Sequence, residues 1–280
     1  MSDRQCLSRA VAFLEGGAAA TPFSGSPELA LPEAKRGALK DSGRPISSRS
    51  YSVSIIVPVL NEASMIQPFL RHVREQAPGA EIIVVDGGSV DETLRLAAGV
   101  CDQLLRSKRN RAAQMNAGAF VAHGDILWFL HVDVRLPARC LEEIARTLAD
   151  SRIAGGYFRI RLPQRKLVYR LTDNFAHYAG LLLRIRCGDH GFFCRRSDFI
   201  ELGGFPDVPI MEDVEFFRML RRRGRMFAIQ QRLIANPRGY EKVGPLRLTL
   251  AYGLIASLYA AGVPLSILAS LYTATCCRRS

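Results

Sequence analysis

The pattern of hydrophobic and polar positions changes sharply near residue 52. Residues 1–50 are rich in Ala, Gly, Ser and Pro and have no sustained apolar period. Such a composition favours an extension without a packed core. From residue 52 the run SVSIIVP is continuous and β-branched, which is typical of a strand buried on both faces. The sequence therefore predicts a flexible extension over 1–50 and a folded domain over 51–245.

Strand and helix patterns then alternate along the domain. Ile66, Phe69, Leu70 and Val73 would share one face of a helix, and EIIVVD (81–86) reads as a second buried strand. Further helices are predicted over 110–123, 140–149 and 213–223, and further strands over 126–133, 153–162 and 191–196. Strands that alternate with helices indicate an α/β fold with a mostly parallel central sheet flanked by helices.

The segment 246–280 is apolar and is predicted to be helical. No charged residue occurs from Leu248 to Cys277, basic residues flank this stretch, and Pro264 divides it. Three interpretations stay open: a hairpin in the membrane interface, a spanning helix, or packing against the domain or a second copy.

The charge balance points to an anionic partner. Lys and Arg number 38 against 26 Asp and Glu, a formal net charge of +12. Nucleic acid is disfavoured because no basic segment is interleaved with aromatic residues, which leaves a phosphorylated ligand or an acidic membrane surface. The seven scattered cysteines and an N-terminus unlike a signal peptide favour a cytoplasmic protein at the cytoplasmic face of a membrane.

Polar side chains follow three of the predicted strands. Asn61 and Glu62 come after the first strand, Asp86 ends the second, and His131 and Asp133 end the strand over 126–133. Ligands of open parallel sheets bind beyond the carboxyl ends of the strands. The sequence therefore predicts one ligand crevice at this edge.

Several sequence strings carry a family resemblance. IIVPVLNEA (55–63), VVDGGSVDET (84–93), RAAQMNAG (111–118), FLHVD (129–133) and GGFPDVPIMEDVEFFRML (203–220) resemble family 2 glycosyltransferases in their order and spacing. The resemblance covers about residues 52–240 and implies the GT-A fold. It departs from the family pattern at His131, where a bacterial subgroup has His-x-Asp in place of Asp-x-Asp.

The resemblance implies a donor site with a divalent metal. Asp133 would bind Mg²⁺ or Mn²⁺, ions that prefer oxygen ligands and substrate phosphates, and His131 would touch ribose or phosphate. The nucleotide-sugar would be bound by Pro58, Asn61, Glu62, Asp86, Asp91, Arg111, Asn116 and His131. For Asp91, stabilisation of a helix start is the competing interpretation.

The resemblance also implies a catalytic pair and an acceptor side. Asp213 would be the general base that deprotonates the acceptor hydroxyl, with Glu212 beside it, although both carboxylates could instead cap the helix that follows. Asp189 and His190, in GDHGFF (188–193), would lie on the acceptor side.

The chain is thus expected to move a sugar from a nucleotide-diphospho-sugar to an acceptor hydroxyl, with inversion and metal assistance. The basic charge and apolar tail suggest a lipid-linked acceptor. One alternative is a nucleotidyltransferase, but the place of its Gly-rich loop is taken by VLNEAS (59–64), and no other Gly-rich phosphate loop occurs. The other is a membrane-associated nucleotide-binding protein without catalysis.

Overall fold

The computed structural model describes residues 51–162, 188–236 and 244–276. The extension predicted over 1–50 lies outside the described residues. The strands are β1 (Val53–Val59), β2 (Glu81–Asp86), β3 (Gln103–Arg106), β4 (Ile126–Phe129), β5 (Val134–Arg135), β6 (Ile153–Arg161), β7 (Phe193–Arg195) and β8 (Arg225–Ala235). The helices are α2 (Ala63–Gln76), α3 (Thr93–Ala98), α4 (Arg111–Val121), α5 (Cys140–Leu148), α7 (Arg196–Glu201), α8 (Glu212–Arg223), α10 (Pro245–Ala260) and α11 (Leu265–Cys276), with a short 3₁₀ helix η2 (Gly188–His190).

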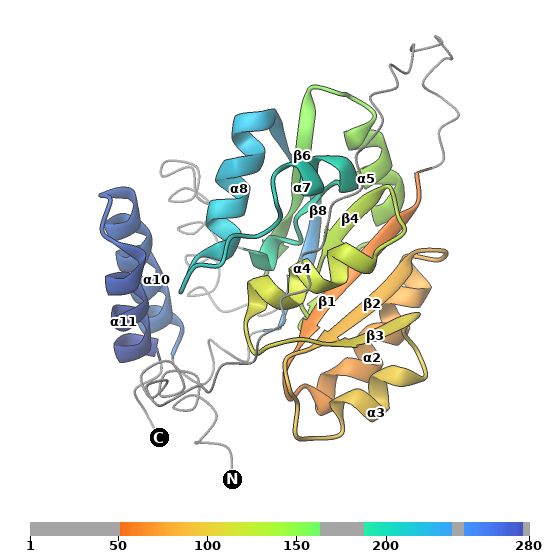
Figure 1. The fold of residues 1–280 in the computed structure, drawn as a ribbon, viewed down its shortest axis with the longest axis horizontal. Coiled ribbons are helices and arrows are strands. Elements are labelled where there is room, and N and C mark those ends of the chain that lie inside the picture. Colours follow the sequence, from red (N-terminus) through yellow and green to blue (C-terminus); the bar gives the residue numbers. More distant parts are fainter. Residues whose placement is uncertain (1–50, 163–187, 237–243, 277–280) are drawn as a thin grey trace, which may run out of the picture. The chain divides into compact units, whose positions relative to one another are not determined.

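The described strands form one eight-stranded sheet in the order β3-β2-β1-β4-β7-β6-β8-β5 (Figure 1). Pairing is parallel from β3 through β2 and β1 to β4. It becomes antiparallel where β7 joins β4 and β6, and parallel again between β6 and β8. The α/β fold expected from the sequence is confirmed, and the sheet is mixed, with parallel pairing from β3 to β4, where the sequence predicts the crevice.

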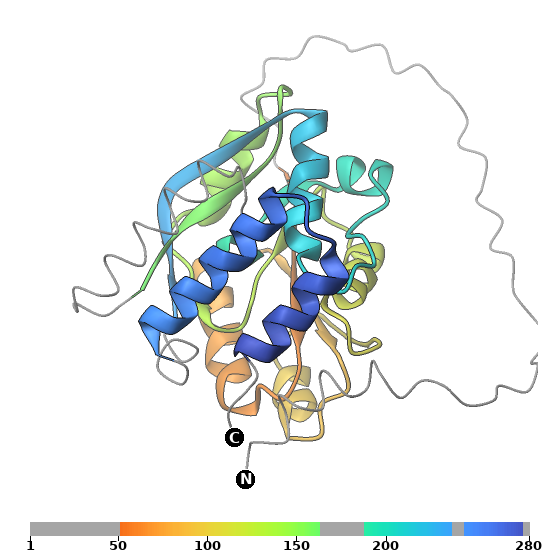
Figure 2. The same ribbon diagram turned by 90° about the vertical axis from the view of Figure 1, so that its left-hand side faces the viewer.

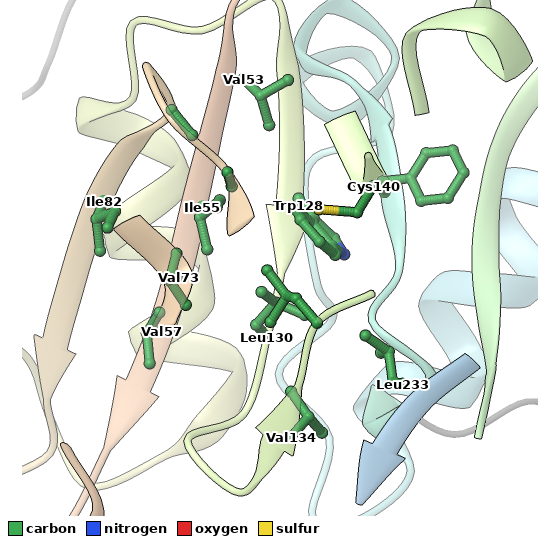
Figure 3. Close-up of a cluster of buried hydrophobic side chains, with 14 of the residues drawn as sticks. Val53, Ile55, Val57, Val73, Ile82, Trp128, Leu130, Val134, Cys140 and Leu233 are labelled. Atoms are coloured by element: carbon green, nitrogen blue, oxygen red, sulfur yellow. The ribbon is translucent and has the colours of Figure 1, made fainter. Parts of the chain in front are cut away.

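Both faces of β1, β2 and β4 are buried, which explains their continuous apolar sequences. Along β1, Ile55 and Val57 belong to one hydrophobic cluster while Ile56 belongs to a second cluster on the other face. Figure 3 shows the first cluster, where Trp128 of β4 lies beside Cys140 of α5. Because successive side chains of a strand point to opposite faces, a strand covered by helices on both sides needs apolar residues at every position.

The strand predicted over 126–133 is shorter than expected. β4 ends at Phe129, after which Leu130 still donates its N–H to the carbonyl oxygen of Ile56 at 3.0 Å. The chain then turns through 131–133 before β5 begins at Val134. His131 and Asp133 therefore lie in a turn beyond the strand end.

Gly118 lets α4 pack closely on the sheet. A Cβ atom at this position would come within 2.6 Å of Ile56 Cγ2 and 3.0 Å of Val85 Cγ2. Alanine normally stabilises a helix interior relative to glycine by about 1 kcal/mol. Here we expect Gly118→Ala to lower the free energy of unfolding by about 1–2 kcal/mol, since overpacking a buried site costs about 1–3 kcal/mol. Urea denaturation followed by circular dichroism measures this difference.

Gly99, at the end of α3, is the matched control. Its φ is −87°, and a Cβ atom added there would meet no other atom within 4 Å. Gly99→Ala should leave the free energy of unfolding unchanged or raise it slightly. Equal effects of the two substitutions would contradict the packing role of Gly118.

The C-terminal apolar segment contains two helices. α10 and α11 lie side by side (Figure 2), and Pro264 directly precedes the first residue of α11. No helix among the described residues has the length and apolar content needed to cross a bilayer.

Candidate active site

The loops after β1 and β2 are tied to each other by polar side chains. The carboxylate of Asp86, fully buried at the end of β2, accepts hydrogen bonds from the Gly88 N–H at 2.9 Å and from Ser89. The Ser89 hydroxyl in turn accepts the N–H of Asn61 at 2.8 Å, and Asn61 Oδ1 accepts the N–H of Val90 at 2.9 Å. Asn61 and Asp86 thus shape the rim of the predicted crevice from adjacent strands.

Asp91 joins the starts of α2 and α3. Its carboxylate accepts the N–H of Thr93 at 3.0 Å and the N–H of Ala63 at 3.2 Å, and the Thr93 hydroxyl accepts the N–H of Glu62 at 2.8 Å. Burial acts to raise the pKa of Asp91, but these hydrogen bonds outweigh it and lower the pKa below its ordinary value. These hydrogen bonds give Asp91 a role at the helix starts, which was the competing interpretation of the sequence. The nucleotide contacts predicted for Asp91 and Glu62 stay predictions.

Pro58 occupies a position in β1 where a proline is tolerated. Pairing of β1 with β4 runs only from Val53 to Ile56, whereas pairing with β2 continues through Pro58 to Val59. Proline cannot donate a ladder hydrogen bond and is confined to positions where none is needed. Pro58 therefore lies where the sheet opens on the side of β4.

Gln114 is a residue of this site that sequence reasoning missed. Its buried side-chain Nε2 donates to the carbonyl oxygens of Val59 and Val85, both at 2.8 Å. A single amide thereby links the carboxyl ends of β1 and β2 at the crevice. The available signal was a polar residue on the inward side of an Ala-rich helix, since buried amides are retained where they satisfy backbone groups.

Asn116 holds the loop before α8. Its Nδ2 donates to the carbonyl oxygen of Phe205 and its Oδ1 accepts the N–H of the same residue, both at 2.8 Å. The amide thus fixes the GGFPD segment against α4. The direct nucleotide contact predicted for Asn116 stays a prediction.

Arg111 begins α4 and is surrounded by carboxylates. Asn110 caps the helix, accepting the N–H of Ala113 at 2.9 Å. Burial acts to lower the pKa of the Arg111 guanidinium, but nearby negative charges outweigh it and raise the pKa above its ordinary value. These charges belong, in decreasing order of effect, to Glu212, Asp189 and Asp213. A guanidinium at this edge suits a diphosphate, which guanidinium groups bind well.

His131 and Asp189 face each other across the crevice. Their Nε2 and Oδ1 atoms are 3.7 Å apart, and the Asp189 side chain is 66% exposed. Burial, and next the positive charge of Arg111, lower the pKa of His131 to about 4, although the charge of Asp189 acts in the opposite direction. His131 is therefore a neutral imidazole at neutral pH and can donate or accept a hydrogen bond.

Asp213 is held at the start of α8, directly against η2. Its Oδ2 accepts the N–H of Gly188, and its Oδ1 accepts the N–H of Val214 at 2.7 Å. Burial, and next the negative charge of Glu212, raise the pKa of Asp213 to about 6. A carboxylate with a raised pKa is a stronger base, which suits the role predicted for Asp213.

Gly188 connects Asp213 with the turn after β4. A Cβ atom there would come within 3.2 Å of Asp213 Oδ2 and 3.5 Å of His131 Nε2. Gly188 thus lies between two predicted site residues that are far apart in sequence. Its role had no separate sequence signal, because it depends on the approach of η2 to α8.

His190 contacts two residues of β6. Its Nδ1 lies 3.0 Å from the carbonyl oxygen of Phe158, and its ring packs edge-on against Tyr157 with centroids 5.7 Å apart. These contacts anchor η2 to β6. The acceptor role predicted for His190 stays a prediction, whereas its anchoring contacts position the neighbouring Asp189.

Two non-glycine residues with a left-handed backbone precede the site acids. Asn61 has φ of 54° directly before Glu62, and Met211 has φ of 63° directly before Glu212. Asparagine tolerates this region, whereas an unbranched apolar residue rarely adopts it. Such backbone strain concentrates at functional sites, consistent with a site at the starts of α2 and α8.

The turn after β4 offers one carboxylate, that of Asp133, to a divalent cation. Within the described ranges, no three His, Cys, Asp or Glu side chains come together as a metal site. Mg²⁺ and Mn²⁺ need no such group when substrate phosphates supply most of the oxygens. Asp133 provides a carboxylate in that turn, where its carbonyl oxygen accepts the N–H of Asn236 at 2.7 Å.

Solved structures of several glycosyltransferases share this fold. The mannosyltransferase PcManGT from Pyrobaculum calidifontis, in complex with GDP-Man and Mn²⁺, is 21% identical with a TM-score of 0.57, over 83% of this chain and 72% of that one. Glucosyl-3-phosphoglycerate synthase from Mycobacterium tuberculosis, in complex with Mn²⁺, UDP and glucosyl-3-phosphoglycerate, is 18% identical with a TM-score of 0.56, over 76% of this chain and 81% of that one. TarS (residues 1–349) from S. aureus is 16% identical with a TM-score of 0.52, over 79% and 69%. At these identities the likeness is one of fold.

The family follows from the match of a family profile to the sequence. No curated protein matches the chain. The profile of glycosyl transferase family 2 matches residues 54–204, a range from β1 to the loop that Asn116 holds, which includes Asp86, Arg111 and Asp133. The chain belongs to glycosyl transferase family 2.

Proposed function

We propose that this glycosyltransferase moves a sugar from a nucleotide-diphospho-sugar to an acceptor hydroxyl, with inversion at the anomeric carbon. The observation that carries the proposal is that Asp213 and Arg111 lie near enough for their charges to act on each other. Such a displacement needs a basic carboxylate beside the acceptor hydroxyl and a cation beside the leaving diphosphate. The structural neighbours in complex with GDP-Man and UDP-Glc support a donor of this class.

The roles of the residues follow from the chemistry of the displacement. The Asp213 carboxylate takes the proton of the acceptor hydroxyl, whose oxygen forms a bond to the anomeric carbon. The bond from that carbon to the phosphate oxygen breaks, and the nucleoside diphosphate leaves with the electron pair. Arg111 stabilises the growing negative charge on the diphosphate. Attack opposite the leaving group inverts the configuration.

A divalent cation completes the donor site in this proposal. Asp133 would hold Mg²⁺ or Mn²⁺, with His131 beside it on ribose or phosphate. When bound, the ion would neutralise charge on the leaving diphosphate. Structural neighbours contain Mn²⁺ or Mg²⁺, which supports this class of cation.

A thermal-shift panel tests the donor site. UDP, GDP, CDP and dTDP are each added with and without Mn²⁺ to the wild type and to Asp133→Ala. One diphosphate should stabilise the wild type only with metal, by about 5 °C at a hundredfold excess over its dissociation constant. Asp133→Ala should lose this shift. Asp207→Ala, which removes an exposed carboxylate paired with Lys108 at 3.3 Å, should keep it.

Two results would contradict the donor site. If no diphosphate stabilises the wild type, the proposed transfer reaction fails. If a nucleoside triphosphate stabilises it more than every diphosphate does, the nucleotidyltransferase interpretation gains instead.

We also propose a lipid-linked acceptor that meets the enzyme at the cytoplasmic face of a membrane. The support is the basic net charge of +12 together with the uncharged C-terminal segment. Release of nucleoside diphosphate from the donor should rise when a membrane lipid extract is added. A rise with the aqueous extract alone would count against a lipid acceptor.

A further inference from the structure

One side of α10 presents a row of exposed leucines. Leu246, Leu250 and Leu254 are 64%, 61% and 52% exposed. Their spacing of four residues places them on one side of the helix, one above another. We call these three residues the leucine face. Solvent exposure of three large apolar side chains in a row is costly, so this face calls for a partner.

The opposite side of α10 is the side that packs. Leu248 and Ile255 are 4% and 6% exposed, and with 3.6 residues per turn they lie away from the leucine face. The orientation of α10 is therefore fixed by its buried side. The leucine face is therefore not the side of α10 that packs against the domain.

Tyr259 attaches α10 to the first turns of α8. Its hydroxyl donates to Glu215 Oε1 and accepts from Arg218 Nη1 at 2.8 Å, and the Arg218 guanidinium lies 5.6 Å from its ring centroid. Since α8 begins with Glu212 and Asp213, the α10 helix is joined to the element that carries the proposed base. A surface bound by the leucine face would therefore be held near the site.

α11 extends this arrangement toward α4. Tyr272 of α11 stacks on Tyr252 of α10 with ring centroids 6.5 Å apart and an angle of 8° between the planes. Tyr272 is also among the groups whose charge acts on Arg111, the first residue of α4. The contact of the pair with α8 is made through Tyr259 of α10.

The charges around the leucine face indicate its partner. Arg247, exposed next to Leu246, donates to the carbonyl oxygen of Thr275 on α11 at 3.2 Å. The sequence then has no charged residue from Leu248 to Cys277, and two arginines follow at 278 and 279. An apolar helix face with an exposed arginine beside it suits an interface between acyl chains and anionic headgroups. Neither described helix of the pair is long and apolar enough to span a bilayer, so the fitting geometry is a helix lying in the interface.

We propose that the leucine face docks the enzyme on an anionic lipid bilayer, with Leu246, Leu250 and Leu254 inserted among the lipids and Arg247 at the headgroups. This docking adds to the proposed function. That it brings the enzyme to a lipid-linked acceptor rests on the proposed function. The docking itself depends only on the exposed leucines and on Arg247 beside them.

Vesicle sedimentation tests the docking with a matched control. The full chain is mixed with vesicles of phosphatidylcholine, alone or with phosphatidylglycerol. The wild type should partition onto the anionic vesicles. Leu250→Glu/Leu254→Glu should bind them at least tenfold more weakly, since burying one leucine changes a partition constant by about that factor. Phe120→Glu, which replaces an 81% exposed apolar residue on α4, should bind within twofold of the wild type.

Arg247→Gln separates the charge from the apolar contribution. It should weaken binding to anionic vesicles roughly fivefold, as expected for one basic residue at a charged surface, and leave any binding to pure phosphatidylcholine unchanged. Circular dichroism and the melting temperature of each variant show that it is folded.

Three results would overturn the docking. In the first, the wild type would bind neither kind of vesicle. In the second, Leu250→Glu/Leu254→Glu would bind the anionic vesicles as the wild type does. In the third, light scattering would show a wild-type dimer that Leu250→Glu/Leu254→Glu converts to a monomer, so that a second copy covers the face. The nucleoside diphosphate panel on the same variants keeps the two proposals apart, because donor binding can fail while vesicle binding persists.

Discussion

Replacing Asp213 with asparagine should lower the rate of sugar transfer by about a thousandfold, because a positioned general base contributes roughly 10²–10⁴ to the rate. The donor should still bind, since Asp213 lies in the first turn of α8, against η2, and does not belong to the loops around Asp86. Release of nucleoside diphosphate, with the donor that the thermal-shift panel identifies, measures the rate. The thermal shift by the diphosphate with Mn²⁺ should stay within about 1–2 °C of the wild-type value, a change of under about 1 kcal/mol.

The wild-type rate should depend on pH through the same carboxyl group. Burial and the charge of Glu212 raise the pKa of Asp213 to about 6, and only the deprotonated form accepts a proton. The rate should therefore rise as the pH increases from about 5 to 7, with its midpoint near 6, and Asp213→Asn should lack this limb.

Glu212→Gln is the informative companion variant. Removing the neighbouring negative charge takes away one cause of the raised pKa, so the acid limb should move to lower pH. The maximal rate should fall less than in Asp213→Asn, because the base itself is retained. An unchanged acid limb in Glu212→Gln, or near-normal turnover in Asp213→Asn, would remove Asp213 from the role of base.

The free energy of unfolding should also depend on the protonation of Asp213, but it should fall over the pH range in which the rate rises. The Asp213 pKa is raised on folding, from its ordinary value of 3.8 to about 6, so the folded state prefers the protonated form. The carboxyl group then costs stability as the pH rises from about 4 to 6, by at most about 3 kcal/mol above pH 6. Relative to the wild type, Asp213→Asn should therefore gain stability over this interval, and the difference should be constant below about pH 4.

The sequence was sufficient to predict the parallel half of the fold. Strands such as β1 and β2 are buried on both faces, so their apolar runs are unbroken, and the helices between them have regular apolar spacing. The return of the sheet through β7, β6 and β8 depends on contacts between distant segments. Gly156, for example, allows β6 to approach the ring of Phe193 and the carbonyl oxygen of Phe227, a requirement that no local pattern reveals.

The residues of the candidate site fall into the same two groups, those that a local pattern indicates and those that depend on tertiary contacts. Asp86, Asp133 and Asp213 stand at strand or helix ends, where local pattern and family motif both indicate function. Gln114 and Gly188 act only through tertiary approach, one by linking β1 to β2 and the other by placing a backbone N–H on Asp213. Sequence patterns report which residues terminate an element, whereas these two roles arise from how the elements meet.

An ionic network around the buried Asp198 holds the far end of the helix that carries Asp213. Asp198 of α7 is 9% exposed, and its carboxylate accepts from Arg223 Nε at 2.6 Å and Arg195 Nη1 at 3.4 Å. Arg195 also donates to the carbonyl oxygens of Ile153 at 2.7 Å and Asp150 at 3.1 Å. Asp198 is therefore the acid shared by two arginines, one on β7 and one at the end of α8.

Asp198→Ala should lower the free energy of unfolding by about 2 kcal/mol, because hydrogen bonds to a charged group contribute about 1.5–3 kcal/mol and Arg223, which is 37% exposed, keeps Glu201 as a partner. For a domain of this size the melting temperature should fall by about 4–8 °C. Chemical denaturation followed by circular dichroism measures the first quantity and differential scanning fluorimetry the second. The control is Glu92→Ala, which removes an exposed carboxylate paired with Arg95 on α3 and should cost under about 1 kcal/mol. If both variants lose equally little, the network contributes no more than a surface ion pair, and α8 must be held by its apolar residues Val214, Phe216, Phe217 and Leu220 alone.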